Sequence, residues 1–417
     1  MPIREINSIQ DVVDWGLCIG CGACAYFCEK EKVSLANVET VGIRPRFEDA
    51  PCAACELRCD CLDICPGYTV RNDRPLEIDE NHSSLIGPSL EIWEGAAADG
   101  EIRFNASSGG GLSALALYCL EKEKMRFVLH VGSDPKKPWI NATVRSRTRD
   151  DLISRTGSRY APASPCDSLD LIEKADGPCV FIGKPCDAEA VSLLRKKRPA
   201  LDRNLGLVLA FFCAGTPSSF GTLDLLRSLD ISKDRINTLR YRGRGWPGRF
   251  DVAFNGSKDK KTLTYKDSWH HLQKFRPFRC HLCPDGLGET SDITCGDAWH
   301  NYGGEDKDPG RSLILARSER GREILHRAIA AGYLDVNKSS SGEVVAAQGL
   351  VQKRREVFGR TLAMKMLMIP TPRYAGYPLF HIWSKNSVYL KFKTVAGTLK
   401  RLATRGLWHR RRPVGPS

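Results

Sequence analysis

The stretch PCVFIGKPCDAEAVSLLRKKR, residues 178–198, decides the fold class. PCVFIG is a short apolar run typical of a buried strand, and GKPCDAEAVSLLRKKR is a turn that opens a helix. Upstream of this stretch, the chain has a run with helical spacing, GLSALALYCLEKEK, followed by a predicted strand, RFVLHVG. Downstream, it has a predicted strand, LGLVLAFFCAG, followed by a predicted helix, SSFGTLDLLRSLD. TLRYRGRGWPGRFDVAF predicts a β-hairpin around Gly245 to Gly248, and RSLILARS with GREILHRAIAAG adds a strand and a helix. This alternation predicts an α/β body over residues 86–337, with α+β as the alternative.

Composition indicates an ordinary globular protein with an unusual number of thiols. The chain has 417 residues, 42% of them hydrophobic and 27% charged, which is enough for two or three domains. The first residues lack the basic start and apolar run of a signal peptide, and the longest apolar run is too short to span a bilayer. Seventeen cysteines without a secretion signal favour metal ligation in a reducing cytoplasm over a disulfide framework.

Nine of the cysteines lie in a loop-rich module over residues 1–75, in the runs CIGCGACAYFC (18–28) and CAACELRCDCLDICPG (52–67). The first run has the spacing of a bacterial ferredoxin, whose fourth cysteine ligates the neighbouring cluster. Zinc has little use for nine thiols in so short a segment. We therefore predict a ferredoxin-like module with two 4Fe-4S clusters; the alternative is one cluster with leftover structural thiols. The expected ligands are Cys18, Cys21, Cys24, Cys28, Cys52, Cys55, Cys61 and Cys65, with Cys28 and Cys65 exchanged between the clusters and Cys59 unliganded.

Four cysteines of the body stand where predicted strands end. Cys186 lies at a strand-to-helix turn, Cys213 ends an apolar strand, and Cys280 and Cys283 form the C-x-x-C of RCHLCPDG. Strand ends of an open α/β sheet gather at one edge, where cofactors bind. Two single thiols and one C-x-x-C would supply the four ligands of a third cluster.

Six motifs occur in order between Ser107 and Trp299: SSGGGLSALALYCLE, GSRYAPASP, IGKPCDAEA, FFCAGTPS, RYRGRGWPG and CHLCPDGLGETSDITCGDAW. In this order they resemble the beta-subunit family of coenzyme F420-reducing hydrogenases and dehydrogenases, flavin iron–sulfur proteins that include 7-hydroxymethyl chlorophyll a reductase. The resemblance implies FAD in the α/β body and one [4Fe-4S] cluster there. It implies Cys186, Cys213, Cys280 and Cys283 as the ligands and leaves Cys119, Cys166, Cys179 and Cys295 as packing residues.

The flavin contacts rest mainly on this resemblance. Glycines and hydroxyls before a helix suit a phosphate or a closely approached ring, but such a turn is usually only a cap. A lysine before Pro185 places a cation near flavin or pyrophosphate, or is a solvated turn residue. The aspartates beside the C-x-x-C loop, Asp292 and Asp297, orient a ligand or satisfy backbone donors. The expected cofactor contacts are Ser108, Gly109, Gly110, Arg159, Tyr160, Lys184 and Asp297; no catalytic residue is assigned.

Flavin exchanges electrons in pairs or singly, whereas iron–sulfur clusters pass one at a time. We therefore expect an oxidoreductase that couples a ferredoxin-like electron donor or acceptor to hydride transfer with a small organic substrate or the deazaflavin coenzyme. The alternatives are a non-catalytic electron-transfer subunit of a larger redox complex and an iron–sulfur nucleic-acid-binding protein. No G-x-G-x-x-G follows a strand, so a nicotinamide domain is not indicated.

The segment 338–417 is predicted to be helical and basic. After Glu356 the chain has no acidic residue and twelve Lys and Arg, which supply most of the net charge of +13. Aromatic and aliphatic residues alternate with these cations, as in helices that lie on surfaces. The segment could contact an anionic membrane peripherally, an acidic electron carrier or nucleic acid, the last being the least expected; otherwise it is a solvated helix.

Overall fold

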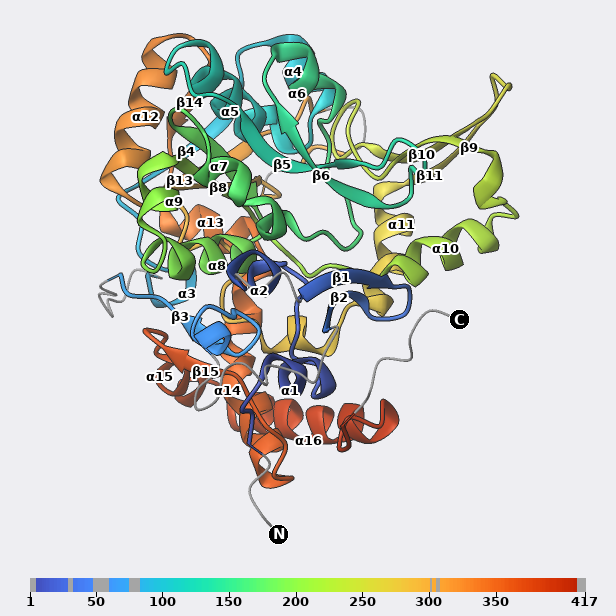
Figure 1. Ribbon diagram of the computed structural model, residues 1–417, viewed down its shortest axis with the longest axis vertical. Helices are drawn as coiled ribbons and strands as arrows, with labels where there is room; N and C mark the ends of the chain where they lie inside the picture. The colour runs from blue at the N-terminus through green and yellow to red at the C-terminus, as the bar shows by residue number, and fades with distance from the viewer. Residues whose placement is uncertain are drawn as a thin grey trace.

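The computed structural model describes residues 5–28, 33–47, 60–74, 83–300, 302–304 and 308–410. Its centre is an eight-stranded mixed sheet, which confirms the α/β class (Figure 1). Four central strands run parallel and antiparallel strands flank them on both sides. In sheet order the strands are β14 (Leu334–Lys338), β4 (Glu91–Ala97), β13 (Ser312–Ala316), β12 (Ile293–Asp297), β8 (Leu205–Phe211), β7 (Cys179–Gly183), β5 (Val128–Ser133) and β6 (Asn141–Ser146).

Helices cover both faces of this sheet, because its central strands bury apolar residues on both sides. On β7, Val180 and Ile182 enter one core with α5 (Gly111–Glu121) and α12 (Glu319–Ala330), and Phe181 enters the other with α8 (Pro185–Arg195) and α9 (Pro199–Asn204). The strand and helix expected from residues 178–198 are therefore present. Shorter helices lie around the body: α3 (Ser83–Ile86), α4 (Gly100–Asn105), α6 (Arg149–Ser154) and α7 (Asp170–Glu173).

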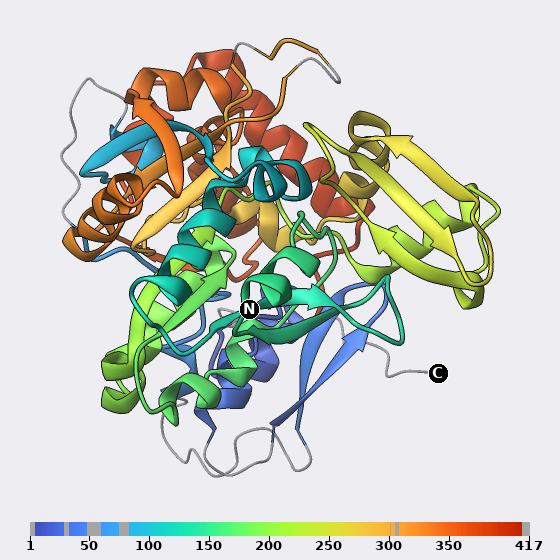
Figure 2. The same cartoon turned by 90° about the horizontal axis from the view of Figure 1, so that it is seen from above.

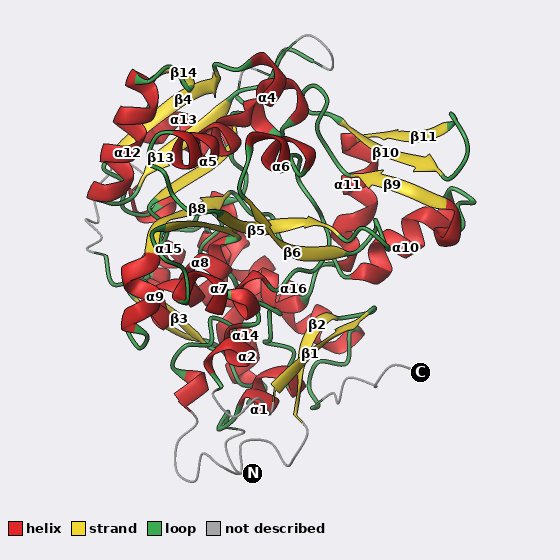
Figure 3. Ribbon diagram, turned by 45° about the horizontal axis from the view of Figure 1, so that its top comes forward, coloured by secondary structure: helices red, strands yellow, loops and turns green. Residues whose placement is uncertain are grey.

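A second, three-stranded antiparallel sheet forms a lobe beside the body (Figures 2 and 3). It contains β9 (Ile236–Arg240), β10 (Arg249–Phe254) and β11 (Lys260–Thr264), packed with α10 (Ser219–Ser228) and α11 (Tyr265–Leu272). β9 and β10 are the predicted hairpin, and residues 241–248 connect them.

The N-terminal module and the C-terminal segment share one hydrophobic core. The module contains α1 (Ile9–Asp14), α2 (Ala23–Phe27), β1 (Val33–Val38), β2 (Gly42–Phe47) and β3 (Thr69–Arg71). The C-terminal segment contains α13 (Ser341–Ala347), α14 (Val351–Met366), β15 (Arg373–Ala375), α15 (Leu379–Ser384) and α16 (Val388–Thr404). β15 pairs in parallel with β3, and Leu402 of α16 packs in the same cluster as Leu17 and Cys18. Among the described residues, no helix combines the length and apolarity needed to cross a bilayer.

Candidate redox site

The N-terminal module brings Cys65 to the three closely spaced thiols of the first run. Cys18, Cys21 and Cys24 lie along the loop that leads into α2, and Cys65 follows the short 3-10 turn at residues 60–62. The Cys24 and Cys65 thiols both lie within electrostatic range of Cys18 and Cys21. This is the grouping expected if Cys65 belongs to the first cluster.

The second expected cluster is only partly within the described residues. Cys28 follows the last residue of α2. Cys61 is buried against Ile9 in a small hydrophobic group, and Cys24 and Cys65 pack at the edge of that group. Cys52, Cys55 and Cys59 lie outside the described residues. The ligands of this cluster therefore stay a prediction.

Backbone geometry brings the first run close to its neighbours. Gly20 and Gly22 both have positive φ, 72° and 87°. A Cβ on Gly20 would lie 2.6 Å from the Ile43 carbonyl oxygen, and one on Gly22 would lie 2.8 Å from the Asp167 amide nitrogen. Only glycine fits both the conformation and the close approach at these positions.

Cys166, expected to be a packing residue, contacts this thiol group directly. Its amide donates to the Cys21 carbonyl at 3.0 Å, and its thiol donates to the Asp187 carbonyl at 3.7 Å. The Cys166 side chain beside the Cys21 sulfur is the main reason that the pKa of Cys21 is lowered, while burial raises the pKa of Cys166. Cys166 lies in the 3-10 helix Pro165–Ser168, so it links the module to the body.

The body thiols converge as the predicted strand ends suggested. Cys186 lies in the first turn of α8, Cys213 follows β8, and Cys280 and Cys283 come from the 3-10 helix Phe278–Leu282 and its end. All four line one small cavity. Burial raises the pKa of Cys186, of Cys213 and, to about 12, of Cys283, and repulsion from neighbouring thiolates adds to it.

This donor set fits an iron–sulfur cluster. Four partly buried thiols that repel one another as thiolates are stabilised by a metal centre, whose binding displaces their protons. Cationic side chains lie beside them: Arg279 and Lys353 line the same cavity, and the Lys353 ammonium donates to the Ala214 carbonyl at 2.5 Å. These cations offset the negative charge that four thiolates bring.

A second cavity, of about 570 Å³, adjoins the thiol cavity. Its size is in the range of cofactor-binding pockets. Five of the seven expected cofactor contacts line it: Ser108, Arg159, Tyr160, Lys184 and Asp297. The two cavities share the wall formed by Lys184, Cys213, Gly215, Thr216, Leu350 and Lys353.

Lys184 is a buried residue of this wall, not a solvated turn lysine. Its side chain is 10% exposed, and its ammonium lies 2.7 Å from Asp187 Oδ2. Burial alone would lower the pKa of Lys184, but the Asp187 carboxylate and the neighbouring cysteines raise it above its usual value. A buried ammonium–carboxylate pair therefore lies between the thiols and the large cavity.

Asp297 belongs to a buried ion pair that the sequence did not reveal. Arg242 donates to both carboxylate oxygens at 2.8 and 2.7 Å, and the Trp246 indole donates at 2.7 Å. Burial alone would raise the pKa of Asp297, but Arg242 outweighs it and the pKa is lowered. The guanidinium also lies 4.6 Å from the centre of the Tyr265 ring, which stacks on Trp299. RYRGRGWPG contains this arginine, yet nothing in the motif singled it out.

The remaining expected contacts have structural partners. The Arg159 guanidinium donates to Asn141 Oδ1 at 2.5 Å and to the Pro138 carbonyl at 2.6 Å, so it fastens the loop after β5. Gly109 and Gly110 do not line the cavity. A Cβ on Gly109 would lie 2.8 Å from the Gly310 carbonyl, so this turn needs glycine for packing. Flavin contact by these three residues stays a prediction.

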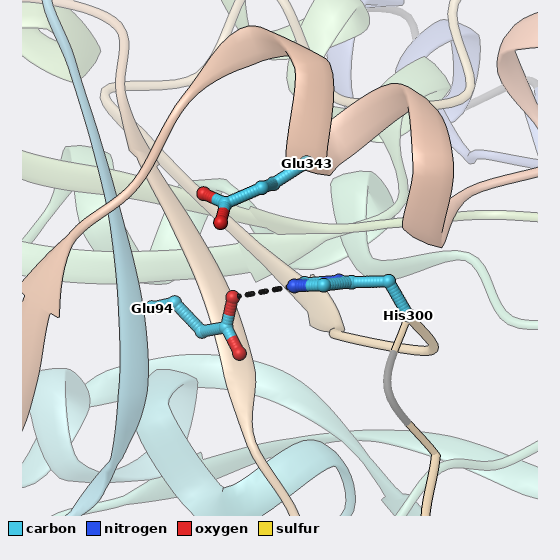
Figure 4. A group of neighbouring side chains, drawn as sticks. All are labelled: Glu94, His300 and Glu343. Atoms are coloured by element: carbon cyan, nitrogen blue, oxygen red, sulfur yellow. Dashed lines mark ion pairs between the residues drawn. The ribbon is translucent and has the colours of Figure 1, made fainter.

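Glu94, His300 and Glu343 form a polar group beside the loop that follows β12 (Figure 4). His300 Nε2 lies 2.9 Å from Glu94 Oε2, and Arg311 pairs with the other oxygen at 2.7 Å. Glu343 accepts from the Ser340 amide and closes the capping box of α13. Protein cations and amides therefore already engage both carboxylates, and the group anchors the loop that carries Trp299.

Family models and known relatives place the chain among proteins of known type. Models described as coenzyme F420 hydrogenase/dehydrogenase beta subunit, N-term and C terminus, match residues 92–169 and 178–341, more than half of the chain together. A coenzyme F420 hydrogenase subunit beta from Methanococcus voltae is 26% identical over 62% of this chain and 86% of its own length. An F420-dependent formate dehydrogenase subunit beta from Methanocaldococcus jannaschii is 25% identical over 58% of this chain and 61% of its own length.

A solved structure shows the same fold. A chain of the F420-reducing [NiFe] hydrogenase complex from Methanosarcina barkeri superposes with a TM-score of 0.51 at 20% identity, over 70% of this chain and 98% of that chain. The motif order, the two matched regions and this fold lead to one conclusion. The chain belongs to the coenzyme F420 hydrogenase/dehydrogenase beta-subunit family.

Proposed function

We propose that the chain is an iron–sulfur flavoprotein oxidoreductase that links single-electron transfer through 4Fe-4S clusters to two-electron transfer at FAD. The observation that carries this proposal is the wall shared by the four-thiol cavity and the large cavity. Redox groups held on its two sides would lie next to each other. Such an arrangement suits transfer between a one-electron and a two-electron centre.

Three sets of thiols would hold clusters: the N-terminal group with Cys65, the four body cysteines, and a set that draws on Cys28, Cys61 and other cysteines of the second run. Iron–sulfur clusters supply single-electron transfer, and FAD supplies hydride exchange with an organic substrate or the deazaflavin coenzyme.

The charged side chains of the wall would bind the cofactors and stabilise their negative charge. The Lys184 and Lys353 ammonium groups lie where they favour negative charge on either side. Arg242, held by Asp297, contacts the rings of Tyr265 and Trp299, which line the large cavity. The stacked aromatic rings would form an apolar part of the cavity lining that excludes water.

The alternative is a subunit that passes electrons to an active site elsewhere in a redox complex. The relatives favour this possibility, because they are beta subunits of a hydrogenase and of a formate dehydrogenase. In that case FAD would exchange electrons only with partner subunits.

Anaerobic purification followed by cofactor analysis tests the proposal. We expect bound FAD and about twelve iron atoms per chain, four for each cluster. Cys186→Ser should remove about four iron atoms, whereas Cys295→Ser, a buried thiol outside the cluster groups, should remove none. Absence of flavin would refute the proposal and favour an iron–sulfur nucleic-acid-binding protein. Bleaching of FAD by a hydride donor without any partner protein would identify an enzyme and not a relay subunit.

A further inference from the structure

The C-terminal segment exposes large apolar side chains that a soluble helix normally buries. Among the described residues, seven of the eleven exposed large apolar side chains lie in residues 366–408, so the exposure is concentrated and not scattered. Val388, Phe392 and Tyr389 of α16 are 81%, 73% and 72% exposed, and Phe380 of α15 is 62% exposed. These four residues are called the apolar patch below.

Packing on α14 fixes which face of α16 points outward. The buried residues of α16 are Thr394, Thr398 and Leu402, at helical spacing. Both threonine hydroxyls donate to carbonyls of their own helix at 2.7 Å, so they need no partner from α14. Gly359 of α14 leaves room for Thr394, since a Cβ there would come within 3.0 Å of it. The helix therefore buries its threonines and turns Val388, Tyr389 and Phe392 away from the protein.

Lysines accompany the apolar patch, and no acidic residue occurs in the chain after Glu356. Lys385 lies in the connection between α15 and α16. The Lys391 ammonium lies 5.6 Å from the centre of the Trp383 ring, and the Lys393 ammonium lies 5.7 Å from that of Tyr389. The surface is therefore apolar and cationic at once.

We propose that the apolar patch and its lysines bind the surface of an anionic lipid bilayer, with α16 in the plane of the headgroups. Aromatic and aliphatic side chains would enter the boundary between headgroups and acyl chains, and lysines would pair with lipid phosphates. An acidic protein would match the lysines, but four bulky side chains projecting from convex helices suit a deformable apolar layer better. α15 and α16 lie at one end of the molecule, away from the lobe of β9–β11, so a planar surface can reach them (Figure 1).

Co-sedimentation of the full chain with vesicles tests this proposal. We expect binding to vesicles of phosphatidylcholine with phosphatidylglycerol, and much weaker binding to phosphatidylcholine alone. Lys391→Gln with Lys393→Gln should weaken binding to the anionic vesicles by roughly tenfold or more. Tyr389→Ser with Phe392→Ser should weaken it by a similar factor, because less apolar surface is buried.

Matched variants elsewhere on the surface provide the controls. Phe104→Ser removes another phenylalanine that is 55% exposed, and Lys260→Gln with Lys261→Gln removes two exposed lysines of β11. Both should bind as the parent does, and circular dichroism should show all variants folded. Equal loss in the controls, or no preference for anionic vesicles, would overturn the proposal. Retention by an immobilised acidic ferredoxin without vesicle binding would replace the bilayer by a protein partner. None of these readouts depends on the proposed redox function.

Discussion

At the residue scale, Cys166 connects the N-terminal thiols to the body, because its amide donates to the Cys21 carbonyl and its thiol lies beside the Cys21 sulfur. Hydrogen bonds to ligand sulfurs stabilise the reduced, more negative cluster. Cys166→Ala should therefore shift the midpoint potential of the proposed N-terminal cluster by about 40 mV to more negative values, if a hydrogen bond from the Cys166 thiol to the ligand sulfur contributes about 1 kcal/mol. An anaerobic redox titration followed by electron paramagnetic resonance measures the shift. Cys119→Ala, which removes a buried thiol of α5, should leave the potential unchanged.

Loss of either residue of the buried ion pair of Arg242 and Asp297 should lower stability strongly, because each residue needs the other as its counter-charge. Asp297→Asn would leave a guanidinium that is 2% exposed without a counter-charge. We expect the free energy of unfolding to fall by about 3–5 kcal/mol, as measured by urea denaturation. Asp176→Asn, which breaks the exposed pair with Arg126, should cost less than about 1 kcal/mol. Similar costs at the two positions would contradict the buried character of the first pair.

His130 should make stability depend on pH. Burial lowers its pKa to about 4, and its Nε2 lies 2.7 Å from the Ser146 hydroxyl. An unfolded histidine titrates near pH 6.5, so between about 6.5 and 4 the unfolded chain binds more protons than the folded chain. The stabilisation is complete above about pH 6.5 and is lost as pH falls, by up to about 3 kcal/mol.

This pH effect is measured as the difference between variants. The difference between the free energies of unfolding at pH 7 and at pH 4.5 should be smaller in His130→Gln than in the parent. His270→Gln, at an exposed position of α11, should keep the parent's full pH dependence. A parent and His130→Gln that lose equal stability on acidification would show that His130 is not responsible.

At the element scale, two glycines test how α16 is held. A Cβ on Gly359 would lie 2.7 Å from Trp383 Nε1, whereas nothing lies within 4 Å of a Cβ on Gly397. Gly359→Ala should separate α14 from α16 and lower stability by about 1–3 kcal/mol. Gly397→Ala should raise it by about 0.5–1 kcal/mol, because alanine loses less backbone entropy in a helix. Thermal denaturation of the two variants checks both signs.

The sequence predicted those helices and strands in which the spacing of apolar residues along the chain reflects which side chains are buried. β7 and β8 were evident because strands buried on both faces are continuously apolar, and α12 because its apolar residues recur at helical spacing. The pairing of β15 with β3 was not predictable. Each strand has three residues, and about 300 residues separate them, so no local pattern records the contact.

The candidate site divides in the same way. Its cysteines could be found because thiol spacing is conspicuous in a chain, and strand ends predicted that the body thiols meet. Arg242 and Lys353 were missed because a buried cation looks like any surface cation in sequence. Only the fold shows that Arg242 faces Asp297 and that Lys353 comes from α14 to complete the cavity wall.

At the scale of the whole molecule, the shared core couples the C-terminal segment to the N-terminal thiols. Leu402 is fully buried in the hydrophobic core that also contains Cys18 and Tyr68. Leu402→Ala should cost about 2–5 kcal/mol and should release iron from the N-terminal module first. Leu226→Ala, in the separate core of the lobe, should cost a similar amount without that iron loss. Iron analysis after mild heating distinguishes the two, and equal iron loss would contradict the coupling.

The wall between the two cavities has a consequence for the order of synthesis. A ribosome releases the chain from its N-terminus, and domains begin to fold while later residues are still being added. Every cysteine of the protein emerges before Leu350 and Lys353, which close that wall. A nascent chain therefore presents all its thiols while one side of the site is still open. We expect insertion of the proposed body cluster to be easiest in that interval, before α14 closes the cavity wall.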